Sequence, residues 1–179
     1  MCGATSVTES GEAKPSLNSL SREEAAAALT RCCGSARWVR GMLSRLPFAS
    51  HTAMFAAAVE IWAQLGPDDY REAFSHHPEI GSNLEELRKK YASTADWSRA
   101  EQSGALGASE ATLHALRDGN RAYRERFGFS FIVCATGKSA EEMLSLLQAR
   151  LKHSPDLELD IAATEQAKIT HLRLEKLES

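Results

Sequence analysis

The dipeptide His77-Pro78 is the first place in this sequence where residue type and position favour acid–base chemistry. A proline disfavours the helical conformation of the residue before it, so a helix that starts near Pro67 must end near His77. The imidazole then lies off the regular helix and can face a cleft, and histidine is the side chain that exchanges protons near neutral pH. The spacing leaves an alternative open, in which His76 and His77 are surface residues or helix C-caps.

A second candidate is a run of five residues at the start of a Gly-rich stretch, Ser98-Arg99-Ala100-Glu101-Gln102. Ser98 and Glu101 have the spacing of a capping box, in which each side chain satisfies a backbone donor of the other residue. The Glu-Gln pair beside small residues also suits a ligand pressed against the backbone, and the amides at a helix start favour negative groups. The spacing alone favours the capping box over the ligand site.

Residues 129–137 read FSFIVCATG and form the one clearly strand-like run in the chain. No second strand is evident, so we expect a buried extended segment between helices, whose backbone donors and acceptors must find partners. A planar, amide-rich ligand or a neighbouring strand would supply such partners. The central residues of the segment are Phe131, Ile132, Val133, Cys134 and Ala135. Cys134 is disfavoured as a nucleophile, because the sequence places no helix terminus or charge nearby that would lower its thiol pKa.

Arg173 is a fourth candidate, near the end of the chain. It shares a helix face with three uncharged residues, Ala162, Gln166 and Ile169. An arginine on a half-apolar face can anchor a carboxylate or an imide oxygen. The alternative is a surface salt bridge with Glu165 or Glu175.

Composition and motif content exclude several classes of protein. The chain has 179 residues, 43% of them hydrophobic and 25% charged, with a net charge of −3, which is ordinary for one globular domain. The charge argues against a nucleic-acid partner, and no apolar run approaches the ~20 residues that span a membrane. The N-terminus has no apolar signal-peptide region. The four cysteines form no CxxC pair and no HExxH is present, so we expect neither a disulfide framework nor a metal site.

Helical periodicity and punctuation predict the elements that must position these residues. Residues 1–20 read as a mobile tail. Four Ser-x-x-Glu capping boxes mark helix starts, at Ser21, Ser82, Ser98 and Ser139. Helices are expected over about 22–33, 35–46, 51–65, 67–77, 110–126, 140–153 and 157–177, with 82–91 as an exposed helix or loop. The last helix is expected to bury Ile161, Ile169, Leu172 and Leu177. The prediction is an all-α single domain over 21–179, a bundle of about seven to nine helices with one short extended segment.

Several segments, in this order along the chain, resemble the OHCU decarboxylase family, where OHCU is 2-oxo-4-hydroxy-4-carboxy-5-ureidoimidazoline. They are AFSHHPEIG at 73–81, DWSRAEQSGAL at 96–106, YRERFGFSFIVCATGKSAEEML at 123–144 and LELDIAATEQAKITHLRLEKL at 157–177. WVRGMLSRLPF at 38–48 fits the first helices of the family. The resemblance covers about residues 21–177.

The resemblance implies an all-α, homodimeric enzyme without a cofactor, which converts OHCU to (S)-allantoin and CO₂ in urate breakdown. It maps the active-site histidine, which precedes proline, to His77, and the essential acid of the substrate loop Ser98–Gln102 to Glu101. Further substrate contacts map to Pro78, to the backbone of residues 131–135 and to Arg173. His77 would transfer protons, Glu101 would orient His77 or the substrate, Gln102 would bind the ring, and Arg173 would bind an anionic oxygen.

The C-terminal residues bear on where the protein is expected to act. The last residues, LES, are not an SKL-type peroxisomal address, so a cytoplasmic enzyme is the simplest interpretation.

One alternative function is a non-catalytic all-α interaction module, and another is a diverged homologue that acts on a different ureido or hydantoin acid. An enzyme site predicts that His77, Glu101 and Arg173 converge in one pocket of ~300–1,000 Å³, whereas an interaction module does not.

Overall fold

The computed structural model of the chain describes residues 16–77, 84, 85, 87, 89 and 109–179. Within these ranges the chain is helical and contains no strand, which confirms the all-α prediction. The helices are α1 (Arg22–Cys32), α2 (Ala36–Ser44), α3 (His51–Ala63), α4 (Pro67–Ser75), α6 (Glu110–Phe127), α7 (Ala140–Arg150) and α8 (Pro155–Glu178), preceded by the short 3₁₀ helix η1 (Leu17–Ser19).

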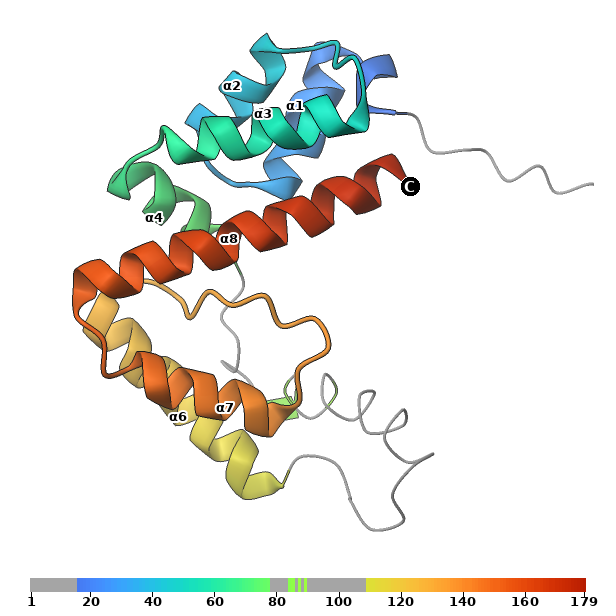
Figure 1. Cartoon of the computed structure of the whole chain (residues 1–179). Coiled ribbons are helices and arrows are strands. Elements are labelled where there is room, and N and C mark those ends of the chain that lie inside the picture. The colour runs from blue at the N-terminus through green and yellow to red at the C-terminus, as the bar shows by residue number, and fades with distance from the viewer. Residues whose placement is uncertain (1–15, 78–83, 86, 88, 90–108) are drawn as a thin grey trace, which may run out of the picture.

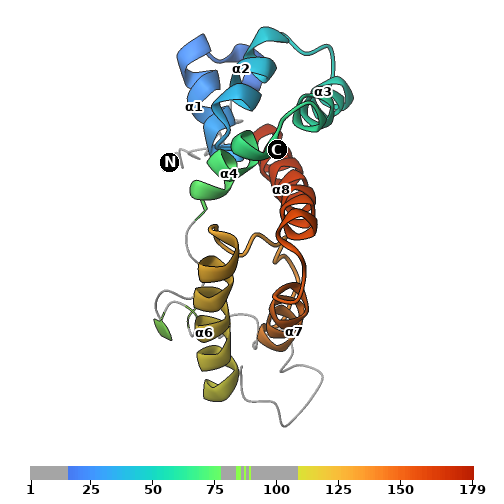
Figure 2. The same ribbon diagram turned by 90° about the vertical axis from the view of Figure 1, so that its left-hand side faces the viewer.

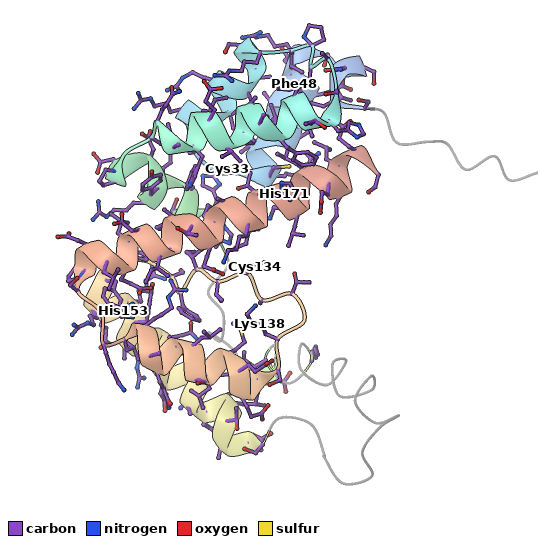
Figure 3. All side chains as sticks on the ribbon, viewed as in Figure 1. Cys33, Phe48, Cys134, Lys138, His153 and His171 are labelled. Atoms are coloured by element: carbon purple, nitrogen blue, oxygen red, sulfur yellow. The ribbon has the colours of Figure 1, made fainter. Side chains whose placement is uncertain are left out.

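Helix α8 runs through the middle of the molecule and separates two groups of helices (Figures 1 and 2). It packs against α1, α3 and α4 on one side, while α6 and α7 pack against each other on the other side. The connection from α6 to α7, residues 128–139, passes between α8 and α7, and Figure 3 labels Cys134 on it. It has no regular secondary structure before the turn near residue 136, as expected for a segment without a strand partner.

Two of the four expected capping boxes lie in the described part of the chain, and both form. The Ser21 hydroxyl accepts from the Glu24 N–H at 3.3 Å, and the Glu24 carboxylate accepts from the Ser21 N–H at 2.9 Å. Ser139 and Glu142 make the same pair of bonds at the start of α7. These caps satisfy amides that have no partner inside the helix, so they fix where each helix begins. The boxes at Ser82 and Ser98 fall outside the described residues.

The buried face of α8 differs from the expected one. The predicted residues Ile161, Ile169, Leu172 and Leu177 are half-buried, and the buried stripe consists of Glu158, Leu159, Ala162, Ala163, Gln166, Thr170 and Leu174. Small residues let the helices approach closely, so that the Trp62 indole N–H donates to the Ala163 carbonyl at 3.1 Å. Apolar periodicity missed this face because α8 is covered on two sides and buries polar groups that have specific partners.

The chain is also ordered earlier than the predicted boundary at residue 20. Leu17 is buried, and its N–H donates to the Glu178 carboxylate at 2.8 Å, while the Ser16 hydroxyl donates to the same carboxylate at 2.9 Å. Residues 16–20 are therefore tied to the end of α8 and are not part of a tail. The prediction for residues 1–15 lies outside the described residues.

A buried polar cluster joins α6 and α7 to the start of α8. The Glu158 carboxylate is fully buried and accepts hydrogen bonds from the Tyr123 hydroxyl and from Arg150 Nε, the latter at 2.8 Å. His153 Nδ1 lies 2.8 Å from the other Glu158 oxygen. Arg150 Nη1 also donates to the Ile132 carbonyl at 2.8 Å, so the cluster reaches the 128–139 connection. Burial, and secondly the bond to Glu158, raise the pKa of the Tyr123 phenol far above its usual range, so it remains a donor.

None of the described helices has the length and apolar character needed to cross a membrane.

We predict that Glu158→Ala lowers the free energy of unfolding by about 3–5 kcal/mol, because it leaves the buried Arg150 charge without its partner. Urea unfolding followed by circular dichroism measures this change. Glu60→Ala is the matched control, because Glu60 pairs with Arg45 on the surface and its side chain is 58% exposed. The control should unfold with the wild type. A Glu158→Ala protein with the same midpoint as the wild type would contradict the structural role of the cluster.

Candidate active site

His77 lies just past the end of α4, as the His-Pro dipeptide predicts. Its N–H donates to the Phe74 carbonyl at 3.1 Å, which closes the last turn, and its side chain is half-buried. The neighbouring His76 points elsewhere, because its ring packs where a Cβ on Gly34 would lie 2.4 Å from its Cγ. The two adjacent histidines therefore have different surroundings, and Pro78 lies outside the described residues.

The imidazole of His77 is held by a buried amide of α8. Its Nε2 lies 2.6 Å from the Gln166 side-chain oxygen, and the Gln166 residue is fully buried. Burial lowers the pKa of His77 below the usual histidine value, and the Arg173 guanidinium lowers it further, while the bond to Gln166 acts in the opposite direction. The net effect is a neutral imidazole near pH 7, which is able to accept a proton.

A cavity of about 290 Å³ brings three of the sequence candidates together. Its walls are His77, the segment 131–136 and a stretch of α8 that includes Ile169, Leu172, Arg173 and Lys176. The volume is close to the lower end of the ~300–1,000 Å³ usual for small-ligand sites. His77 and Arg173 thus converge as an enzyme site requires. The remaining candidates, Ser98, Arg99, Ala100, Glu101 and Gln102, lie outside the described residues.

Charged side chains hold the segment that lines this cavity. The Cys134 N–H donates to the Glu165 carboxylate at 2.7 Å, and the Ile132 carbonyl accepts from Arg150. Burial raises the pKa of the Glu165 carboxyl, but hydrogen bonds from Lys168 and Cys134 outweigh it and lower the pKa overall. These partners are neither the ligand nor the strand that the sequence suggested. A ligand would therefore meet backbone groups of 131–135 other than these two.

Arg173 donates through Nη1 to the carbonyls of Arg31 and Cys32, at 3.1 and 3.3 Å. These carbonyls belong to the C-terminal end of α1, where the helix dipole favours a cation. The salt bridges considered from sequence do not form: Glu165 pairs with Lys168, and Glu175 pairs with His171. In the described structure no carboxylate neutralises Arg173, so its guanidinium can attract an anion into the cavity.

The sequence predicted residues that line the cavity, but not the side chains that hold those residues in place. Gln166 lies two turns before Arg173 on the same helix face, so the sequence already placed an uncharged amide beside a candidate residue. Glu165 and Arg150 gave no such signal, because each acts on a backbone group far away in sequence. Among the described residues, no group of three or more His, Cys, Asp or Glu side chains is placed to hold a metal ion.

Comparison with known proteins gives consistent matches along most of the chain. The sequence model of the OHCU decarboxylase family matches residues 18–175. The chain is 40% identical over 151 residues to the Uric acid degradation bifunctional protein TTL of Arabidopsis thaliana, covering 82% of this chain. It spans only 45% of the Arabidopsis protein. It is 35% identical over 136 residues to the 2-oxo-4-hydroxy-4-carboxy-5-ureidoimidazoline decarboxylase of Amia calva, covering 73% of this chain and 74% of that protein.

The fold matches as well. A crystal structure of an OHCU decarboxylase in the presence of (S)-allantoin superposes with a TM-score of 0.69 at 36% sequence identity, and the match covers 89% of this chain and 99% of that one. The family match extends over nearly all of the described helices and includes His77, the 131–135 segment and Arg173. This chain belongs to the OHCU decarboxylase family.

Proposed function

We propose that this chain decarboxylates OHCU to (S)-allantoin, with release of CO₂ and without a cofactor. The observation that carries the proposal is the convergence of two side chains on one cavity: the neutral imidazole of His77 and the guanidinium of Arg173, which has no carboxylate partner among the described residues. OHCU carries a carboxylate, so a cavity with a cationic wall suits it. The related enzyme whose crystal structure was determined in the presence of (S)-allantoin supports the same substrate class.

The chemistry needs a place for an electron pair and a managed proton. When the bond between C4 and the carboxylate breaks, CO₂ leaves and its electron pair passes into the adjacent unsaturated ring system. The resulting enolate-like species must be stabilised and then protonated on one face. Arg173 would bind an anionic oxygen of the substrate, and His77 would accept a proton in one step and deliver it in another. The ring itself accepts the electrons, so the proposal requires no metal or pyridoxal.

The remaining assignments rest on the family resemblance. Glu101 would orient His77 or the hydroxyl and ureido groups of the substrate, and Gln102 would hydrogen-bond the ring. Ser98, Arg99, Ala100 and Pro78 would complete the substrate contacts. The backbone of 131–135 would bind the ring through the groups that Glu165 and Arg150 do not occupy.

A homodimer and a cytoplasmic location also belong to the proposal. Both rest on the family resemblance. Val59 on α3 is 64% exposed and borders half-buried Phe55, so this face of α3 offers apolar area to a second copy.

A chiral assay tests the function. Urate is supplied with urate oxidase and hydroxyisourate hydrolase, the protein is added, and the circular dichroism of the allantoin is followed. OHCU also decays spontaneously to racemic product, so an excess of the (S)-enantiomer is a cleaner signal than rate. Racemic allantoin in the presence of the folded protein would support the alternatives, an interaction module or an enzyme for another ureido acid.

We predict that His77→Asn lowers the turnover of OHCU by ~10²–10⁴-fold, the usual effect of removing a general acid or base. His76→Ala is the matched control, because His76 is exposed and does not line the cavity. The control should retain most of the activity in the chiral assay. Activity of His77→Asn close to that of the wild type would show that the proton-transfer assignment is wrong.

We predict that Glu101→Gln separates two roles for Glu101. As a capping residue it would be replaced well by Gln, since either side chain can accept the backbone hydrogen bond. As a catalytic carboxylate it needs its charge, so we expect a wild-type melting temperature with activity at least ~100-fold lower. Normal turnover of the variant would return Glu101 to a structural role.

A further inference from the structure

A line of buried polar groups extends from the imidazole of His77 into the protein, away from the cavity. His77 Nε2 bonds the Gln166 side-chain oxygen at 2.6 Å, and Gln166 Nε2 donates to the Thr170 hydroxyl at 3.1 Å. Gln166 is fully buried and Thr170 is 6% exposed. The Thr170 hydroxyl also acts on the thiol of Cys33, a buried residue at the end of α1, whose pKa it lowers. None of these three residues has a role in the proposed reaction, so their arrangement needs its own explanation.

The orientation of the Gln166 amide gives each hydrogen bond its direction. A carboxamide is ambiguous, because its oxygen accepts and its nitrogen donates, and a flip exchanges the two. Burial raises the pKa of the Cys33 thiol to about 11, and hydrogen bonds from the Ser35 backbone and then the Thr170 hydroxyl offset part of this rise. In the structure the amide nitrogen of Gln166 faces the Thr170 hydroxyl and donates to it. The amide oxygen then has to face His77.

An amide oxygen beside Nε2 has a defined consequence for the imidazole. Which ring nitrogen of a histidine carries the proton is set by the hydrogen bond that the ring makes. An oxygen that only accepts requires a proton on Nε2, and a neutral ring then has its lone pair on Nδ1. A carboxylate in the same place would hold the ring equally well, but would also stabilise the imidazolium and raise the pKa of His77. The neutral amide orients the ring with only a small effect of this kind, which burial and Arg173 outweigh.

We propose that Gln166 and Thr170 are positioning residues that hold His77 in the tautomer protonated on Nε2, so that Nδ1 is the nitrogen that exchanges protons. The catalytic part of this inference rests on the proposed function, whereas the tautomer is a property of the resting protein. The proposal adds two side chains to the site that do not line the cavity. It also explains why a buried face of α8 carries a glutamine and a threonine in place of apolar residues.

The charged groups around His77 favour its neutral form. Arg173 and Lys176 of α8 line the cavity described above, and His76 precedes His77 on the chain. His77 also borders a second cavity of about 280 Å³, which Arg71 of α4 and Arg124 of α6 line. Among the described lining residues of both cavities, the charged side chains are cations. The neutral amide of Gln166 therefore orients the ring while its surroundings keep it uncharged.

Nitrogen-15 NMR of histidine-labelled protein tests the tautomer directly, without any assay of activity. The His77 signals are assigned by their loss in His77→Asn, and the shifts of Nδ1 and Nε2 report which nitrogen is protonated. We expect a protonated Nε2 and a bare Nδ1 in the wild type near pH 7. A proton on Nδ1 in the wild type would overturn the inference, even if the protein proved to be fully active on OHCU.

Thr170→Val tests whether the relay sets the tautomer. The variant removes the acceptor of Gln166, so we expect a mixture of tautomers and a kcat lower by about 10–100-fold, as for the partners that orient metal-binding histidines. We expect KM to change little, because Thr170 does not line the cavity. Thr164→Val is the matched control on the same helix, since the exposed Thr164 hydroxyl donates only to the carbonyl one turn back. An unchanged tautomer and kcat in Thr170→Val would overturn the relay.

Gln166→Glu provides a second variant of nearly the same shape. The new carboxylate accepts the same bond, so Nε2 keeps its proton, but the charge should raise the pKa of His77. If neutral His77 is the active form, activity falls as pH decreases through this pKa, and the fall should begin at higher pH in the variant. The nitrogen-15 titration measures the same pKa independently of turnover. A pKa that stays at the wild-type value in the folded variant would overturn the contact. Absence of decarboxylation with the expected tautomer would reject only the proposed function.

Discussion

The fully buried carboxylate of Glu158 is the constraint on which the rest of the molecule depends. A charge removed from water is tolerated only when it is paired and hydrogen-bonded, and Arg150, Tyr123 and His153 provide those contacts. The first turn of α8, where the helix dipole favours an anion, holds this group at the junction with α6 and α7. Because Arg150 also binds the Ile132 carbonyl, the same cluster fixes a wall of the candidate active site.

The site itself is assembled from places where helices end. His77 follows α4, and Arg173 is oriented by the last carbonyls of α1. Helix ends expose backbone groups that α-helical bonding leaves unused, so they can hold charged or polar side chains at low cost. The middle of α8 supplies the complementary parts, with Glu165 turned to the 131–135 segment and Gln166 turned to His77. The proposed chemistry therefore takes place between two groups of helices that share one long helix.

Local signals in the sequence account for the elements and for much of the site. Capping boxes and prolines locate helix starts to within a residue or two, and the His-Pro dipeptide places His77 at a helix end. Arg173 and the 131–135 segment were found by type and pattern and do meet His77. The buried face of α8 was predicted wrongly, because apolar periodicity does not see a stripe of small and polar residues with individual partners. The bonds from Glu165 and Arg150 to backbone groups depend on tertiary packing, which no local pattern encodes.

The continuity of α8 gives these contacts a shared geometry. Glu158, Glu165, Gln166, Thr170 and Arg173 all lie on one unbroken helix. The helix advances about 1.5 Å and turns about 100° per residue, so Glu158 and Arg173 are separated by roughly 22 Å along its axis. A single inserted or deleted residue between them would turn every group beyond it by that angle and detach it from its partner. Between Glu158 and Arg173, substitutions that keep the helix are therefore tolerated better than a change in the number of residues.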